Sequence, residues 1–484
     1  MTQFIGGEWC KGSGKNFSSF NPATGDEIWN GTVSDASDVD NAVQAARATF
    51  ATWSLTKLED RLAIVRRFGE IVADKKEELA ALIALETGKV VWDAQGEAGA
   101  CAAKVEISIK SYAERTGNRE TVNGAMRSRL THRAHGVMAI FGPYNFPGHL
   151  PNGHIVPALI AGNTIVFKPS ELTPAVAEKM VSFWHEAGLP AGVINLVQGG
   201  KDTGIALAGN EDIDGLLFTG SATTGRALAR QLSARPEVIS ALEMGGNNAL
   251  IVDEVEDLKA AAVMTINSAF ISSGQRCTCA RRLIVPKGQK GDAFIEILLQ
   301  AMKGITIGTD ENAYMGPVIS AAAAGTVLKA QTDMLKEGGK ALMLCEHLPQ
   351  GAAWLSPGLI DVTDIADRVD EEVFGPLLQL IRVEDLKEAV VVASDTRYGL
   401  AAGLLSDSQE AYDYFYPRIR AGIVNWNQQL TGAASTAPFG GPGWSGNHRP
   451  SAYYAADYCA WPVASIENAN NKVELAAMPA GLKF

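Results

Sequence analysis

The chain has 484 residues, of which 46% are hydrophobic and 20% charged, and its formal net charge at pH 7 is −12. At roughly 150 residues per domain this length corresponds to about three domains, and the composition excludes a disordered chain. Because a negatively charged protein repels nucleic acid and anionic membrane surfaces, we expect neither as a partner.

The first hundred residues are predicted to be mainly helical. Apolar residues recur at helical spacing from residue 39 to residue 50, behind Ser37 and Asp40, which have the pattern of a capping box. A second helix is expected from about Asp60, with Gly88 placed to end it.

From residue 136 short apolar strands alternate with helices. The strands of a first series are expected at residues 137–141, 164–167, 193–197, 216–218 and 238–242. A second series begins at residues 249–252 and continues at 283–285 and near 377. This alternation predicts parallel sheets with helices on both faces, in two α/β domains rather than one continuous sheet.

Two polar segments stand outside this alternation. Residues 121–133, which contain three arginines and a histidine, interrupt the first domain and are expected to form an exposed hairpin or an oligomerisation arm. The tail from residue 447 is aromatic and polar, without clear periodicity.

Cysteine and histidine usage indicates neither disulfides nor a metal site. The six cysteines are scattered, and none of the seven histidines pairs into a metal-binding spacing. No signal peptide is evident at the start of the chain, so we expect a cytoplasmic protein.

Cys277 lies in Ser-Ser-Gly-Gln-Arg-Cys-Thr, at the expected end of a helix. A turn of this kind can expose a thiol and leave backbone N–H groups free to hold an oxyanion, and Arg276 is placed to lower the pKa of the thiol. The alternative is a buried structural cysteine, and the local sequence leaves the two interpretations about even.

Glu243 and Asn145 are the other candidates for chemistry. Glu243 ends an apolar strand and precedes two glycines, where partial burial would raise its pKa towards that of a general base. The alternative is an ion-paired surface glutamate. Asn145, in a loop rigidified by two prolines, could donate to an oxyanion, although its local sequence alone favours an Asx-turn.

Residues 220–225 follow a strand and open a helix, which is the place for a phosphate or dinucleotide loop, although the glycine spacing is not G-x-G-x-x-G. Lys168 also lies just past a strand, so both fall at the carboxyl edge of one sheet. Glu171 could accept hydrogen bonds from a ribose diol. The alternative for Lys168 is an ordinary solvated lysine.

Taken in chain order, seven segments resemble the aldehyde dehydrogenase superfamily. They are residues 141–147, 167–171, 218–221, 242–246, 274–278, 371–376 and 438–441. The resemblance implies an α/β fold with a Rossmann-like coenzyme domain (1–120 and 134–245), an α/β catalytic domain (246–446) and a small oligomerisation element (121–133 and 447–484). It also implies a homodimer or homotetramer.

The same resemblance implies roles for individual residues. Cys277 matches the family nucleophile, Glu243 the general base and Asn145 the oxyanion donor. The positions that match contacts to the coenzyme are Lys168, Glu171, Gly220, Ser221, Gly225, Glu372 and Phe374. In similar enzymes an acid at the position of Glu171 favours NAD, because it would repel a 2′-phosphate.

Residues 148–154 and 445–454 depart from the general family pattern. Together with residues 457–459 they resemble the members that oxidise N-succinyl-L-glutamate 5-semialdehyde to N-succinyl-L-glutamate in arginine catabolism. This small polyanionic aldehyde needs local cations or donors. The candidates are Arg276, Thr278, His149, Phe439, Arg449 and residues 431–436. An oligomer contact is the alternative for residues 448–449. Another anionic semialdehyde, or a catalytically silent binding protein, is the alternative for the function.

Overall fold

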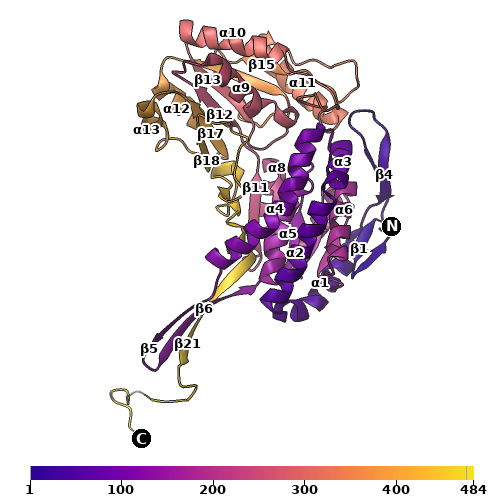
Figure 1. The fold of residues 1–484 in the computed structure, drawn as a ribbon, viewed down its shortest axis with the longest axis vertical. Coiled ribbons are helices and arrows are strands. Elements are labelled where there is room, and N and C mark those ends of the chain that lie inside the picture. The colour runs from indigo at the N-terminus through magenta and orange to yellow at the C-terminus, as the bar shows by residue number, and fades with distance from the viewer. Residues whose placement is uncertain (1, 476, 484) are drawn as a thin grey trace.

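The chain folds around two seven-stranded sheets, and the computed structural model describes residues 2–475 and 477–483. The first sheet has the strand order β11-β10-β7-β8-β9-β1-β2, and the second has the order β14-β15-β16-β13-β12-β17-β18. Figure 1 shows the second sheet and its helices at one end of the molecule, the first sheet below it, and a long hairpin at the opposite end. The predicted α/β class is confirmed.

Five consecutive strands of the first sheet, from β11 at one edge to β9, are parallel. The strands are β1 (Gln3–Ile5), β2 (Glu8–Cys10), β7 (Val137–Phe141), β8 (Thr164–Lys168), β9 (Ile194–Leu196), β10 (Gly215–Gly220) and β11 (Ile239–Met244). In this register Phe141 lies opposite both Lys168 and Phe218, and Thr219 lies opposite Glu243. The carboxyl ends of four strands therefore share one edge of the sheet.

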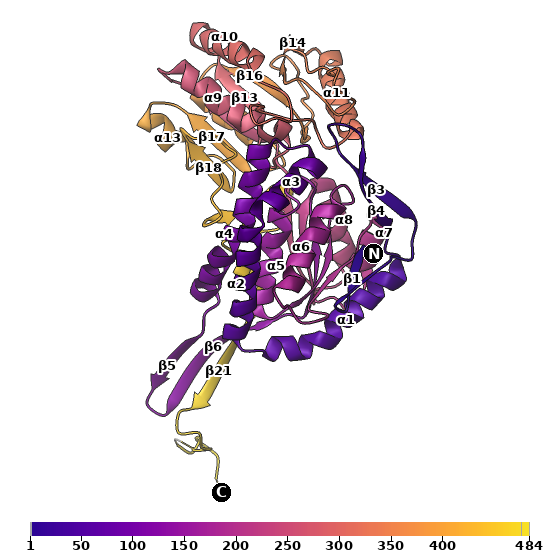
Figure 2. The ribbon, with the colours of Figure 1, turned by 45° about the vertical axis from the view of Figure 1, so that its right-hand side comes forward.

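The prediction of a mainly helical first hundred residues is wrong for residues 3–32. β1 and β2 extend the first sheet, while β3 (Asn16–Phe20) and β4 (Glu27–Thr32) form a separate ribbon. Figure 2 shows this ribbon running along the outer edge of the molecule. The turn between its strands reaches the second half of the chain, where the Trp354 indole donates to the Ala23 carbonyl at 3.0 Å.

The helices around the first sheet are α1 (Ala36–Leu55), α2 (Leu58–Asp74), α3 (Lys76–Thr87), α4 (Val91–Arg115), α5 (His149–Ala161), α6 (Pro174–Glu186), α7 (Lys201–Gly209) and α8 (Ala222–Leu232). The capping box of α1 is made by Asp35 and Asp38, not by Ser37 and Asp40. The second predicted helix is two helices, separated at Lys75, and Gly88 ends the later one in the left-handed conformation.

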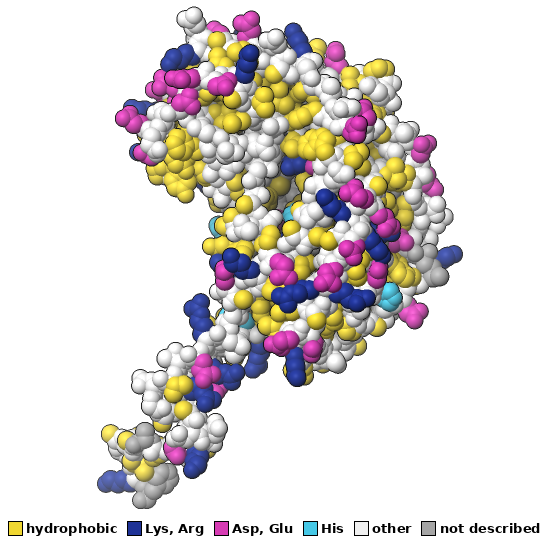
Figure 3. Space-filling view, in the orientation of Figure 1, with side chains coloured by type: hydrophobic (Ala, Val, Ile, Leu, Met, Phe, Trp, Pro, Cys, Tyr) yellow, Lys and Arg dark blue, Asp and Glu magenta, His cyan; other side chains and the backbone are white. Residues whose placement is uncertain are grey.

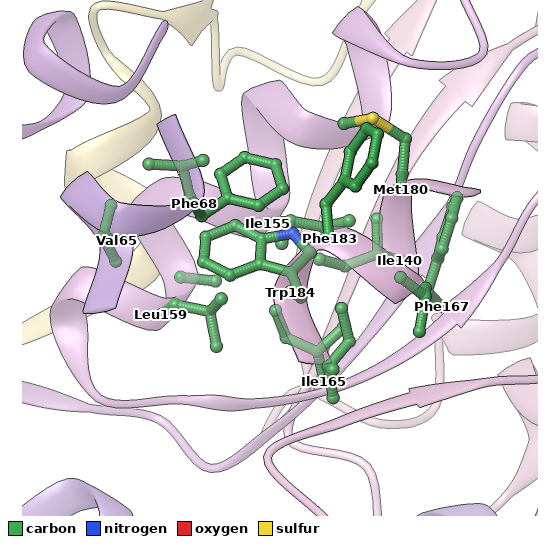
Figure 4. Packing of buried hydrophobic residues seen from close by; sticks show 14 of the residues in the cluster. Val65, Phe68, Ile140, Ile155, Leu159, Ile165, Phe167, Met180, Phe183 and Trp184 are labelled. Atoms are coloured by element: carbon green, nitrogen blue, oxygen red, sulfur yellow. The ribbon is translucent and has the colours of Figure 1, made fainter. Parts of the chain in front are cut away.

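The core beneath these helices holds α5 in place. Phe68 of α2 and Trp184 of α6 stack at 3.7 Å between ring centroids, and Leu159 of α5 and Ile165 of β8 lie beside them (Figure 4). Full burial of each such side chain stabilises the fold by roughly 1.5–3 kcal/mol. This packing fixes α5 and the end of β8, and both contribute to the candidate site.

The second sheet is built from β12 (Asn248–Val252), β13 (Ala280–Pro286), β14 (Lys340–Met343), β15 (Gly358–Asp361), β16 (Leu377–Val383), β17 (Ala401–Leu405) and β18 (Ile423–Trp426). Its helices are α9 (Leu258–Ala269), α10 (Gln289–Lys303), α11 (Ala321–Lys336), α12 (Leu386–Ser394) and α13 (Gln409–Phe415). The chain then returns to the first half through β19 (Pro438–Phe439), β20 (Ser451–Ala452) and α14 (Ala455–Cys459).

The hairpin consists of β5 (Arg119–Asn123) and β6 (Met126–Ala134), and β21 (Ala460–Asn468) pairs with β6. The strand in the tail was not predicted. Figure 3 shows positive and negative side chains interspersed over this face of the molecule, without a large patch of one sign. No helix of the described chain combines the length and apolar character needed to cross a membrane.

Candidate active site

Two cavities meet at Cys277. The large cavity, of about 880 Å³, follows the carboxyl edge of the first sheet. The small cavity, of about 390 Å³, lies beside α4 and α5. The residues that line both are Leu150, Thr219, Glu243, Cys277 and Phe439. A molecule in either cavity can therefore approach the same thiol and the same carboxyl group.

The large cavity contains most of the residues matched to coenzyme contacts. Its wall includes Lys168, Glu171, Gly220, Ser221, Glu372 and Phe374. Gly225 does not line it, since it packs against Met244 and Phe218, and a Cβ there would clash with the Met244 sulfur. A glycine is needed at position 225 because α8 approaches the sheet closely there.

Lys168 is buried, which contradicts the alternative of a solvated lysine. Its ammonium donates to the carbonyls of Pro169 at 2.7 Å and Gly199 at 2.6 Å. Burial lowers the pKa of Lys168 to about 8, while the nearby Glu171 carboxylate acts in the opposite direction. The strand end thus holds a cation in the cavity wall by two backbone carbonyls.

Glu372 enters the wall of the large cavity from the second half of the chain. Its carboxylate lies so close to Gly245 that a Cβ there would clash with it, which explains the glycine after β11. Arg281 approaches Glu372 at 3.5 Å, and burial raises the pKa of this carboxyl group. The ring of Phe374 packs edge-on against Tyr144, with the ring centroids 6.0 Å apart.

The turn before Cys277 has an unusual backbone. Ser272, Ser273 and Gly274 are all left-handed, with φ of 53°, 55° and 72°, and a Cβ at Gly274 would clash with the Gly375 carbonyl. Left-handed non-glycine residues cost of order 1–3 kcal/mol each and persist only when their surroundings hold them. Here Ser273 donates to the Gly316 carbonyl at 2.6 Å.

Three side chains clamp the backbone around Cys277. Asn145 donates to the Gln275 carbonyl at 2.9 Å, and Asn248 donates to the Cys277 carbonyl at 2.7 Å. The buried Arg281 donates to the carbonyls of Gly274 at 2.6 Å and Arg276 at 2.9 Å. Neither Asn248 nor Arg281 was predicted. Arg281 could have been suspected from the sequence, because two arginines stand inside the otherwise apolar strand β13.

The thiol of Cys277 is strongly desolvated. Burial, together with the Glu372 and Glu243 carboxylates, raises its pKa to about 12, and Arg281 acts in the opposite direction. Arg276 does not fill the role expected of it, because its guanidinium is neutralised by Asp93 at 2.7 Å and also donates to Ser272. Arg281, the second residue of β13, is the cation that acts on the thiol.

The raised pKa predicts slow alkylation of Cys277 in the free protein. Below the pKa the thiolate fraction rises tenfold with each pH unit, so the rate with iodoacetamide should rise about tenfold per unit from pH 7 to pH 10. Peptide mass spectrometry of Cys277 measures this rate directly, with Cys10, the other partly exposed cysteine, as an internal comparison. A plateau below pH 9 would contradict the desolvated thiol.

Glu243 is buried rather than ion-paired at the surface. Its Oε1 accepts a hydrogen bond from the Ser451 backbone N–H at 3.1 Å, and its Oε2 has no partner within the described part of the chain. Burial raises the pKa of this carboxyl well above its ordinary value. The structure therefore presents a desolvated carboxyl group to both cavities.

The small cavity brings together four of the five predicted substrate contacts. They are His149, Arg276, Thr278 and Phe439. Arg449 is exposed, does not line the cavity, and acts electrostatically on His135 instead. Of residues 431–436, Thr431, Ala433, Ala434 and Ser435 line the cavity.

Two histidines line the small cavity, the buried His154 and the partly buried His149. Burial lowers the pKa of His149 to about 4 and that of His154 to about 3, so both are neutral at pH 7. His154 exchanges hydrogen bonds with Tyr458 at 2.9 Å and Thr219 at 3.0 Å. Among residues 2–475 and 477–483, no group of three or more His, Cys, Asp or Glu side chains is arranged to hold a metal ion.

Comparison with known proteins identifies this architecture. The family model described as "Aldehyde dehydrogenase family" matches residues 9–461. The chain is 57% identical over 467 residues to a protein of Chromobacterium violaceum named N-succinylglutamate 5-semialdehyde dehydrogenase, covering 96% of each chain. It is 54% identical over 484 residues to a Paraburkholderia xenovorans protein of the same name, covering 99% of each chain.

A solved structure has the same fold. The crystal structure of indole-3-acetaldehyde dehydrogenase in complex with NAD⁺ superposes with a TM-score of 0.91 at 30% identity, covering 96% of each chain. The family match spans nearly the whole sequence, and the relatives agree with it. The chain belongs to the aldehyde dehydrogenase family.

Proposed function

We propose that the protein oxidises N-succinyl-L-glutamate 5-semialdehyde to N-succinyl-L-glutamate with NAD, as a step of arginine catabolism. The proposed reaction is supported mainly by one observation: a large and a small cavity meet at Cys277 and Glu243. The substrate is supported by the names of relatives that are 53–57% identical over nearly their full length.

The residues of the large cavity fit a dinucleotide. The cavity lies at the carboxyl edge of a parallel sheet, where such sheets bind nucleotides, and Ser221 caps the N-terminus of α8, where a pyrophosphate is favoured. Lys168 and Glu171 would hold the adenosine ribose, and Glu372 the nicotinamide ribose. The Glu171 carboxylate would repel a 2′-phosphate, which favours NAD over NADP. Bound NAD supplies the acceptor for the hydride that leaves the substrate carbon.

The thiol and its surroundings begin the reaction. The thiol of Cys277 first loses its proton to solvent. The resulting thiolate attacks the aldehyde carbon, and the carbonyl oxygen becomes an oxyanion on a thiohemiacetal. The Asn145 amide has two N–H donors, of which the bond to Gln275 uses one. The second N–H, together with the Cys277 backbone N–H, would hold the oxyanion. Loss of hydride then leaves a thioester on Cys277.

Glu243 completes the cycle. Its unpartnered Oε2 accepts a proton from water, and the water oxygen attacks the thioester carbon. The C–S bond breaks, the carboxylic acid is released, and the thiol is restored. Desolvation raises the pKa of Glu243, which makes its carboxylate a stronger base once it is ionised.

The predicted substrate preference can be measured with a panel of aldehydes. We expect kcat/KM for N-succinyl-L-glutamate 5-semialdehyde to exceed that for betaine aldehyde, succinate semialdehyde and unsuccinylated glutamate semialdehyde by at least about tenfold. NADH formation gives each rate, and repetition with NADP tests the coenzyme. A preference for another aldehyde would overturn the substrate and leave the reaction class intact. Absence of turnover with the whole panel would overturn both.

We also infer that the protein forms homo-oligomers through the sheet of β5, β6 and β21. This sheet projects from the body and exposes the apolar side chains of Val122, Met126 and Ile466. Apolar residues on a projecting sheet are typical of a surface that another subunit covers.

A further inference from the structure

Lys104 is a buried lysine in the wall of the small cavity. It lies on α4, its residue is only 2% exposed, and it lines the same cavity as Cys277. Within the described chain its ammonium has neither a hydrogen-bond acceptor nor an ion-pair partner, although lysines are almost never fully buried without one. An unpaired buried cation beside a cavity points to an anion that binds there.

The other charges around the small cavity are already balanced. Asp93 pairs with Arg276 at 2.7 Å, and Glu97 pairs with Lys89 at 2.5 Å. Glu97 also accepts from the backbone N–H groups of Gly148 and His149. The carboxyl group of Glu243 is desolvated and its pKa is raised. Among the described residues that line this cavity, the ammonium of Lys104 is therefore the one cation that lacks an ion-pair partner.

The groups around Lys104 do not compete for its charge. Burial and, to a lesser extent, the Lys104 ammonium lower the pKa of His149 and His154, so these imidazoles are neutral, and the nearby Cys459 is a buried thiol. Burial lowers the pKa of Lys104 to about 8, so the ammonium still predominates at pH 7. Lys104 is thus a cation among neutral polar side chains. Such a site is suited to a carboxylate, which accepts strong hydrogen bonds from an ammonium group.

We propose that Lys104 binds a carboxylate of the aldehyde substrate and makes the small cavity selective for anionic aldehydes. The identity of that aldehyde rests on the proposed function, but the requirement for a negative charge rests on Lys104 itself. A purely structural role is disfavoured, because a buried charge without a partner does not stabilise a fold.

The test compares Lys104→Met with Lys110→Met. Lys110 lies on the same helix, is 69% exposed, and approaches Glu114 at 3.8 Å, so its substitution removes a charge outside the cavity. We expect Lys104→Met to lower kcat/KM for N-succinyl-L-glutamate 5-semialdehyde about 10- to 100-fold, the range of a charged hydrogen bond. The rate with hexanal, a neutral aldehyde, should change less than about twofold. Lys110→Met should leave both rates unchanged.

The ratio of anionic to neutral kcat/KM decides the proposal. An unchanged ratio in Lys104→Met would overturn it, and so would an equal loss with both aldehydes. If the wild-type protein prefers another anionic aldehyde, the proposed function fails on the substrate, but the same ratio measured with that aldehyde still tests Lys104.

Thermal unfolding gives a second, independent readout. N-succinyl-L-glutamate, the expected product, should raise the Tm of the wild-type protein and of Lys110→Met, and should not raise that of Lys104→Met. Without ligand, Lys104→Met should unfold at the same temperature or higher, since it removes an unpaired buried charge. Equal ligand-induced shifts in all three proteins, or a large loss of Tm in Lys104→Met alone, would overturn the proposal.

Discussion

Replacement of Cys277 by alanine is expected to lower dehydrogenase turnover by at least about 10⁴-fold, the scale seen when a covalent nucleophile is removed. Without the sulfur no thiohemiacetal forms, and the remaining groups cannot turn the aldehyde into a species that readily loses hydride. The protein should stay folded, because the substitution removes a single atom from a partly buried residue at the junction of two cavities. Steady-state NADH formation measures the loss, and thermal unfolding checks the fold.

Cys10→Ala is the matched control. Cys10 and Cys277 are the two cysteines that are only partly buried, and Cys10 lies on β2 at the far edge of the first sheet, away from both cavities. Its replacement should leave turnover unchanged. In Cys277→Ala the NAD affinity, followed by quenching of tryptophan fluorescence, should also persist. Full activity in Cys277→Ala would refute the covalent mechanism.

The parallel sheets could be predicted because their strands are short, apolar and separated by helices. The predicted strand at residues 137–141 is β7, and those near 164–167 and 238–242 are β8 and β11 with shifts of one to two residues. β1 and β2 were missed because each has three residues, too few to establish a period of two. The resemblance implied that the tail joins the 121–133 arm, but the strand β21 was not predicted, because the tail has no clear periodicity and its partner, β6, is more than three hundred residues earlier in the chain.

The positions of the candidate site residues follow from strand ends, which a sequence reveals. Lys168, Glu243 and the loop at Gly220 all end strands of one parallel sheet, so its topology brings them to one edge. Asn248 donates to carbonyls 29 and 31 residues later in the chain, a pairing that local spacing cannot give. Arg281 reaches back seven residues to Gly274, but only across a left-handed turn whose shape the sequence does not reveal. Arg449 shows that local sequence can also mislead. It was chosen as a cation in a segment that departs from the family pattern, yet it does not line the small cavity.

The burial of Lys104 could have been predicted from the sequence of α4. Ala94, Ala98, Cys101 and Val105 form the buried stripe of α4, and helical periodicity places Glu97 and Lys104 on the same stripe. Two opposite charges on a buried stripe suggest a mutual pair. The structure shows instead that Glu97 pairs with Lys89, which leaves Lys104 to the cavity. Only the fold distinguishes these two arrangements.

Replacement of Glu243 by glutamine is expected to lower steady-state turnover by about 10²- to 10⁴-fold, the contribution of a positioned general base. The glutamine amide keeps the shape of the side chain and can still accept from the Ser451 N–H, but it cannot take a proton from water. Hydride loss precedes this step. The first turnover should therefore remain fast, and a burst of about one NADH per active site should precede a slow steady state.

The two phases distinguish a base from a structural residue. Stopped-flow absorbance should give the burst, and mass spectrometry of the quenched protein should find an acyl group on the Cys277 peptide. Glu254→Gln is the control, because Glu254 is an exposed carboxylate paired with Lys290 at 2.9 Å. It should keep both phases. A normal burst followed by normal turnover in Glu243→Gln would exclude Glu243 as the base.

The direction of the Glu243 pKa shift adds a pH dependence to the same experiment. Burial raises the pKa, so the carboxylate that acts as a base is scarce at low pH and becomes more abundant as the pH rises. Deacylation in the wild-type protein should therefore accelerate with pH over the range in which this group ionises. In Glu243→Gln no such group remains, and the slow phase should lose this rising limb. Retention of the same limb would assign the titration to another group and remove the electrostatic basis for Glu243 as the base.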